Sequence, residues 1–166
     1  MIKKLLIFVL FFLLVGCGNL EFVYKLNKNL QTLNGFTDTS VNGDDSNQVY
    51  SLLKESIGDN SSSNAKYKLL VNSTKIEAAE IIEKDATASK FRITFYISYK
   101  IYYLAENCKI FDEEIKTVSF YSAKAAGYSF ATDLSKNDSI SQNISKNKDE
   151  FFSKLNKIEA IDSCAD

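Results

Sequence analysis

Residues 91–103 read FRITFYISYKIYY, and this stretch decides the fold class of the chain. Every second residue from Phe91 to Tyr103 is apolar or aromatic, and most residues between them are polar. Because successive side chains of a strand point to opposite faces, the pattern predicts one long strand with an apolar core face and a polar outer face. Tyr96 and Tyr102 add aromatic rings to that outer face.

Three shorter strands are expected around the long one. Residues 36–41 form a short polar strand, and the alternation of Tyr67, Leu69 and Val71 with polar neighbours predicts a half-buried strand. A charged link over 77–85 would then lead into the long strand. After a turn near 106–107, residues 110–122 would pair back as a hairpin.

Apolar residues recur at helical spacing in two further segments. Ser46 is in the position of an N-cap and Gly58 is where that helix would end, after about three turns. Residues 140–161 carry apolar side chains three and four apart, which predicts an amphipathic helix of about 20 to 25 residues. The segment 123–133 before it is expected to be a loop.

The order strand, helix, three strands, helix predicts an α+β fold. We expect a two-layer sandwich in which two helices pack on one face of a mostly antiparallel, four-stranded sheet. The length of residues 17–166 suits a single domain with its own core.

The first hydrophobic stretch is short and ends at a cysteine. Lys3 and Lys4 precede an apolar run over residues 5–15, which is shorter than the ~20 residues that a membrane-spanning helix needs. Such a run is typical of a secretory signal peptide, with a membrane helix as the alternative. The run Leu-Val-Gly-Cys that ends at Cys17 resembles a bacterial lipobox, which implies removal of residues 1–16 and lipidation of Cys17.

The composition excludes several classes of function. Without Lys3 and Lys4, the 20 basic residues fall to 18 against 21 acidic ones, so we expect no nucleic-acid binding. The chain has no histidine, which excludes Ser-His-Asp and Cys-His nucleophiles and His-ligated zinc. It also lacks a CxxC motif and a glycine-rich phosphate loop. We therefore predict no catalytic residues, no metal site, no cofactor and no enzymatic activity.

Basic side chains lie on the predicted outer face of the long strand. Lys90 and Arg92 are two residues apart and point the same way, and Lys100 follows further along. Such a pair can bind the phosphates of an anionic lipid headgroup, and lipopolysaccharide is one such lipid. The alternative is an ordinary solvated face whose charges prevent aggregation of strands.

Cys108 and Cys164 remain after lipidation of Cys17. The strand over 110–122 leads away from the turn at Cys108, and the last helix returns over a similar length, so both cysteines should lie at one end of the molecule. An exported protein can keep a disulfide between them. Two free thiols are the alternative.

The lipobox and several strand motifs together resemble one known family. They are Cys17-Gly18, Phe22-x-Tyr24, Tyr67-x-Leu69-x-Val71, Ser89-Lys90-Phe91-Arg92, Tyr99-x-Ile101, the strand from Thr117 to Tyr121 and the terminal amphipathic helix. In this order they are similar to the LPS-assembly lipoprotein family LptE, in its alphaproteobacterial form, over nearly the whole mature chain.

The resemblance implies a lipid-anchored, periplasm-facing outer-membrane lipoprotein. Such a protein plugs the lumen of the LptD β-barrel and helps to deliver lipopolysaccharide to the cell surface. Gly18 after the lipid cysteine is similar to an outer-membrane sorting signal. The alternative is a surface or periplasmic scaffold lipoprotein without a role in lipid transport.

Overall fold

The computed structural model describes residues 28–58, 64–85, 87–123, 129–158, 161 and 164. The elements along the chain are α2 (Lys28–Leu33), β1 (Thr37–Gly43), α3 (Ser46–Ile57), β2 (Tyr67–Ile82), β3 (Ala88–Tyr103), β4 (Cys108–Ser122) and α4 (Ser129–Leu155). The predicted signal peptide 1–16 and lipidation site Cys17 lie outside the described residues, as does the chain up to residue 27.

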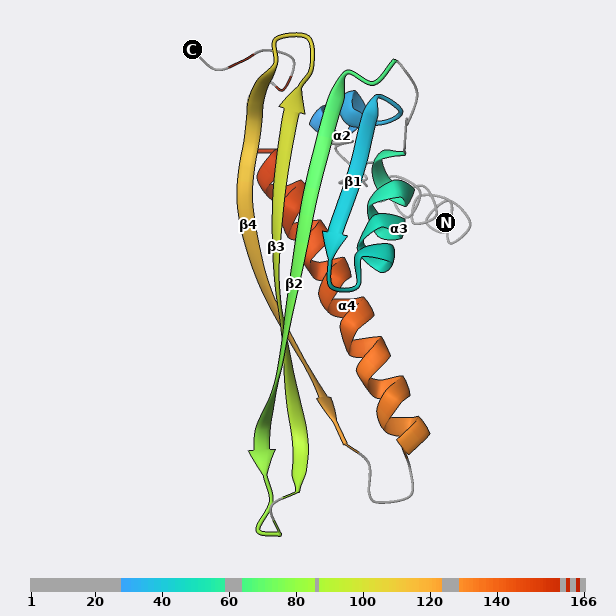
Figure 1. The fold of residues 1–166 in the computed structure, drawn as a ribbon, viewed down its shortest axis with the longest axis vertical. Helices are drawn as coiled ribbons and strands as arrows, with labels where there is room; N and C mark the ends of the chain where they lie inside the picture. Colours follow the sequence, from blue (N-terminus) through green and yellow to red (C-terminus); the bar gives the residue numbers. More distant parts are fainter. Residues whose placement is uncertain are drawn as a thin grey trace, which may run out of the picture.

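The four strands form one open sheet in the order β1-β2-β3-β4 (Figure 1). β3 pairs antiparallel with both β2 and β4, whereas β1 runs parallel to β2. The helices pack on one face, with α4 against β3 and β4 and α3 against β1 and β2. This confirms the predicted α+β fold with a mostly antiparallel, four-stranded sheet.

The described residues form three helices where the sequence predicted two. The additional helix, α2, has six residues and begins the described part of the chain. Six residues are too few to display a helical repeat of apolar residues, which explains why the pattern did not reveal it. Asn29 on α2 donates hydrogen bonds to the carbonyl oxygens of Leu155 and Ile158, at 2.8 and 2.9 Å. The Asn29 side chain of α2 therefore caps the C-terminal end of α4.

The expected charged link over 77–85 is wrong, because β2 continues to Ile82. Glu77 pairs with Ile93 and Ala78 with Arg92, so hydrogen bonding to β3 carries the strand through this charged sequence. The alternation of apolar and polar residues disappears there because most side chains of this half of β2 are exposed on both faces. The β2–β3 hairpin extends well beyond β1 (Figure 1).

The expected loop over 123–133 is also wrong in part, since α4 begins at Ser129. Its first turns carry few apolar residues, and Leu134 remains 52% exposed, so no amphipathic pattern marks them. At the other end, α4 stops at Leu155, and the predicted helical residue Ile161 lies beyond it in the core. Within the described residues, no helix has the length and apolarity that a membrane crossing requires.

The core lies between the sheet and the helices. Alternate residues of β3, from Ile93 to Ile101, are fully buried, as the alternation predicted. Phe151 of α4 stacks on Tyr99 with ring centroids 4.2 Å apart, and it meets Phe111 edge to face. Aromatic pairs of this kind stabilise the fold beyond the area that they bury.

Candidate functional site

The face of the sheet away from the helices carries the predicted basic residues. Lys90, Arg92 and Lys100 all belong to the even-numbered residues of β3, which point away from the core. A shallow depression of about 200 Å³ lies on this face. Its lining residues come from three strands and are Ile76, Ala78, Arg92, Thr94, Tyr96, Lys116 and Val118.

Each of the two closely spaced cations already has a neighbour. Lys90 places its Nζ 4.6 Å from the ring centroid of Phe120, and Arg92 Nε lies 3.5 Å from Glu80 Oε2. The Arg92 side chain is 48% exposed, so this ion pair is a weak one that water screens. Both cations therefore remain accessible to an anion.

Lys100 does not belong to the same cluster. Eight residues separate it from Arg92 along β3, which corresponds to about 26 Å. Its partner in the register is Asp112 on β4. The structure thus brings Lys90 and Arg92 together and leaves Lys100 near the opposite end of the face.

Lys116, which no sequence pattern indicated, also lines the depression. Lys116 lies opposite Tyr96 in the register, with Nζ 5.4 Å from the ring centroid. Only the pairing of β3 with β4 places this lysine beside Arg92, so no local pattern could have revealed it. Arg92 and Lys116 hence both line the depression, and Lys90 lies two residues from Arg92 on the same face of β3.

Exposed apolar side chains accompany these cations. Ile76 and Phe120 on the same half of the sheet are 52% and 46% exposed, and Ile82 near the end of the hairpin is 66% exposed. We call the group formed by Lys90, Arg92, Lys116, Tyr96, Ile76 and Phe120 the distal surface. Its mixture of cations and apolar groups suits a ligand that is both anionic and amphipathic.

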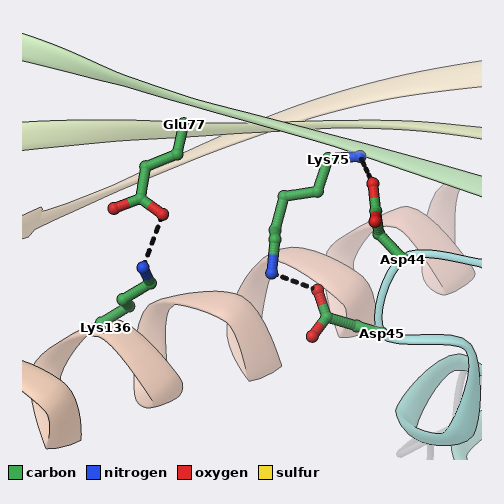
Figure 2. A network of polar contacts seen from close by, with 5 residues as sticks. All are labelled: Asp44, Asp45, Lys75, Glu77 and Lys136. Carbon is green, nitrogen blue, oxygen red and sulfur yellow. Dashed lines mark hydrogen bonds and ion pairs between the residues drawn. The ribbon is translucent and has the colours of Figure 1, made fainter.

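On the helix side, ion pairs tie the distal half of β2 to its neighbours (Figure 2). Lys136 of α4 pairs with Glu77 at 2.6 Å, and Lys75 pairs with Asp45 at 2.7 Å. The backbone N–H of Lys75 also donates to Asp44 Oδ2 at 2.7 Å. These contacts position both α4 and the β1–α3 turn on β2.

Asp45, not Ser46, occupies the N-cap position of α3. Asp45 has a φ of 49°, and its side chain makes no capping hydrogen bond. The carboxylate instead meets the Lys75 ammonium group, as Figure 2 shows. An interaction across the sheet has therefore replaced the local cap that the sequence predicted at Ser46.

The carboxylate of Glu77 also accepts a short hydrogen bond from the hydroxyl of Tyr121. Partial burial alone would raise the pKa of Glu77, but the hydrogen bonds from Lys136 and Tyr121 outweigh it and hold that pKa below its usual value. Burial, followed by the nearby Glu77 carboxylate, raises the pKa of Tyr121. Glu77 is thus ionised and Tyr121 is neutral at neutral pH.

A buried polar seam, which no sequence pattern indicated, joins α4 to the sheet. Its members are Ser139, Asn143 and Asn147, which are at most 7% exposed and lie four residues apart on one side of the helix. They donate hydrogen bonds to the carbonyl oxygens of Phe120, Ile93 and Ile115 respectively. The four-residue spacing could have suggested a shared face, but side chains of this type are usually exposed.

The structure joins Cys108 and Cys164 in a disulfide, with Cα atoms 6.1 Å apart. The backbone N–H of Cys164 donates to the Glu106 carboxylate at 3.1 Å. Glu106 and the two sulfurs are close enough together to hold a metal ion, but oxidised sulfurs do not offer the thiolates that a metal binds. The disulfide is therefore a covalent link between the β3–β4 turn and the segment after α4.

No protein-family model matches this sequence, and no curated protein matches it. Solved structures of bacterial proteins share the fold. One, from Caulobacter crescentus and assigned as a lipoprotein, is 13% identical, with a TM-score of 0.59 over 79% of this chain and 92% of the other. Lipoprotein B from Nitrosomonas europaea is 6% identical, with a TM-score of 0.55 over 78% and 88%. A minor lipoprotein from Acinetobacter baumannii is 12% identical, with a TM-score of 0.50 over 75% and 92%.

Proposed function

We propose that this chain is a lipid-anchored protein of the bacterial envelope. It binds an outer-membrane β-barrel protein of the LptD type, and it supports lipopolysaccharide assembly at the cell surface. The observation that carries the proposal is the lipobox at Cys17 in front of a fold that three bacterial lipoproteins share. The mature chain would face the periplasm from the inner leaflet of the outer membrane.

The position of α2 supports a defined orientation toward the membrane. Ten residues lie between Cys17 and Lys28, so the connection between them spans at most about 40 Å. α2 lies at the end of the molecule opposite the tip of the β2–β3 hairpin (Figure 1). The distal surface would consequently lie at the end of the molecule that points away from the lipid anchor.

The distal surface supplies the chemistry for lipopolysaccharide. Lys90 and Arg92 project from one side of β3, and a guanidinium group can bind a phosphate through two parallel hydrogen bonds. Ile76 and Phe120 beside them offer apolar contact for acyl chains. In this proposal Lys100 is a peripheral contact, because it lies about 26 Å from Arg92.

The proposed role is organisational and needs no catalysis. The polar groups that the structure brings together, such as Glu77 with Lys136 and Tyr121, form closed ion pairs and hydrogen bonds between elements. They hold α4 on the sheet and so maintain the shape that a partner would recognise.

A second candidate is a scaffold lipoprotein without a role in lipid transport. The observation in its favour is that Arg92 already pairs with Glu80 and Lys90 already lies over Phe120. Such contacts are common on an ordinary solvated strand face.

Crosslinking in native membranes tests the proposal. A photoreactive residue at Ile76, on the distal surface, should capture a large β-barrel protein, whereas one at exposed Glu55 of α3 serves as the control. Depletion of the lipoprotein should lower the amount of lipopolysaccharide at the cell surface. Capture of a soluble periplasmic protein, with surface lipopolysaccharide unchanged, would support the scaffold function instead.

The anchor has its own test. Mass spectrometry of the mature protein should find an N-terminal Cys17 that carries acyl chains, and Cys17→Ala should release the protein from membranes. Retention of residues 1–16 in the mature chain would contradict a lipid anchor.

A further inference from the structure

Among the described residues, no strand lies beside the outer edge of β4. β4 is the last strand of the sheet, and from Phe111 to Ser122 it pairs with β3 in one continuous register. The backbone N–H of Ala123 donates to the carbonyl oxygen of Ser89, which establishes that the odd-numbered residues of β4 bond to β3. The even-numbered residues must therefore direct their backbone groups away from the sheet.

The free part of this edge runs from Asp112 to Val118. At its far end, Phe120 has its carbonyl oxygen covered by the hydroxyl of Ser139 on α4, at 2.6 Å. Within the described part of the chain, the outward backbone groups of residues 112, 114, 116 and 118 have no hydrogen-bonding partner. Proteins usually protect such an edge with a bulge, a proline or charged side chains, and of these the stretch has only charged side chains.

The charges along the edge indicate what covers it. Lys109 pairs with Asp112 at 2.5 Å, and Lys154 pairs with Glu113 at 2.9 Å. Glu114 has no ion-pair partner among the described residues, and Lys116 lies two residues further on the same face. Glu114 and Lys116, separated by a single residue, are therefore the acid and the base of this edge that have no ion-pair partner among the described residues.

We infer that the free edge of β4 pairs with the same edge of a second copy of this chain, antiparallel and around a two-fold axis at Ile115. This register places Glu114 of each copy opposite Lys116 of the other, which forms two identical ion pairs. It also lets the outward backbone groups of residues 112–118 pair with one another.

Other two-fold registers are less favourable. Moving the axis by one residue toward the start of β4 places Glu114 opposite Glu114, and moving it by one residue the other way places Lys116 opposite Lys116. Like charges that face each other across strands are destabilising. Ser139 of α4 stops the pairing at Phe120, so the contact extends over seven residues of each copy.

The dimer should be weak in solution. A single pair of seven-residue strands buries less than the ~1,000 Å² that a stable interface usually needs. Confinement to a membrane through the proposed lipid anchor raises the effective concentration and compensates for the small area. The inference goes beyond the proposed function, since its test needs neither lipopolysaccharide nor a barrel partner.

Sedimentation equilibrium of the full mature protein, in density-matched detergent over a range of protein-to-detergent ratios, tests the pairing. Glu114→Lys and Lys116→Glu should each weaken the dimer about tenfold, because both ion pairs become repulsive. The double variant E114K/K116E restores opposite charges and should recover the wild-type association. Glu55→Lys, on the exposed surface of α3, is the matched charge control and should change nothing.

Three outcomes would overturn the inference. They are a wild-type protein that stays monomeric at every ratio, a double variant as weak as the single ones, and a Glu55→Lys control that weakens the dimer equally. Circular dichroism of each variant shows that the fold is retained, as expected for exposed positions.

Discussion

Tyr99 on β3 donates its hydroxyl hydrogen to Asn147 Oδ1 on α4 across 2.8 Å, and both side chains are fully buried although 48 residues separate them. Burial raises the pKa of Tyr99, so the hydroxyl stays protonated and remains a donor. The amide nitrogen of Asn147 donates to Ile115 O and to Thr117 Oγ1, each at 2.9 Å. One side chain thus connects α4 to two strands and establishes its register on the sheet.

Asn147→Ala should destabilise the protein by about 2 to 4 kcal/mol. The change leaves the Tyr99 hydroxyl and Thr117 Oγ1 without this partner, whereas the Ile115 carbonyl oxygen keeps its bond to β3, and each unsatisfied buried group costs about 1 to 3 kcal/mol. Urea unfolding measures the loss. Gln142→Ala on the exposed side of α4 is the control and should change stability by less than about 0.5 kcal/mol. Equal effects of both substitutions would show that the seam contributes little.

Gly43→Ala should be strongly destabilising, because Gly43 has a φ of +95° and an added Cβ would lie only 2.0 Å from the carbonyl oxygen of Ser73. Relief of this clash would break the end of β1 away from β2. Gly35→Ala is the matched comparison, since Gly35 also has a positive φ of +74° but has open space around it. We expect thermal unfolding to show a much larger loss for Gly43→Ala. Similar losses would mean that backbone conformation alone sets the cost.

Glu77→Gln should make the free energy of unfolding less dependent on pH at acidic pH. The pKa of Glu77 in the folded protein lies below its usual 4.5, so its ionisation stabilises the fold above that pH. The stabilisation is lost as the pH falls through the lowered pKa. Urea unfolding between pH 7 and pH 3 should therefore give a flatter profile for Glu77→Gln, with lower stability at pH 7. Glu55→Gln on the exposed surface of α3 is the control substitution.

Removal of the disulfide should destabilise the protein by about 4 kcal/mol. Cys108 and Cys164 are 56 residues apart, and the estimate follows from the entropy that a loop of this length restrains in the unfolded chain. The double variant Cys108→Ser/Cys164→Ser isolates the effect. Peptide mapping without reduction should find the two cysteines linked. Recovery of two alkylatable thiols from the native protein would contradict the bridge.

The double variant Lys90→Ala/Arg92→Ala should weaken lipopolysaccharide binding, most clearly at low salt, where the attraction between cations and phosphates is least screened. Loss of two charge-assisted contacts should cost roughly tenfold or more in affinity. Lys100→Ala should have a smaller effect, because it lies about 26 Å away along β3. Unchanged binding of the double variant at low salt would contradict a role for this pair.

Much of the fold was predictable, and the errors have one physical cause. The buried residues from Ile93 to Ile101 and the helix that ends at Gly58 both lie where one face meets the core and the other meets water. There the environment imposes a periodicity that the sequence displays. The distal half of β2 is mostly exposed on both faces, and residues 131–136 of α4 are exposed or half-buried, so no periodicity marks them. Their structure depends on a partner strand or on distant ion pairs.

The candidate site also has one part that was predictable from the sequence and one part that was not. The alternation along β3 was sufficient to place Lys90 and Arg92 on one face, because side-chain direction in a strand is a local property. Lys116, Glu80 and Phe120 join them only through the register of neighbouring strands. The seam of Ser139, Asn143 and Asn147 was likewise invisible, since polar side chains become core residues only when distant carbonyl groups receive their hydrogen bonds.

By itself, the sequence determined the alternation that makes a two-sided sheet and the helical stripe that covers one side, because each of these depends on residues close together along the chain. The run before Cys17 that resembles a lipobox is also local in sequence, and it stays a prediction. The tertiary structure decided which cations share a depression, which polar groups lie buried and which strand edge stays open. Those properties depend on strand order and register, which bring together residues such as Tyr99 and Asn147 that are far apart in sequence.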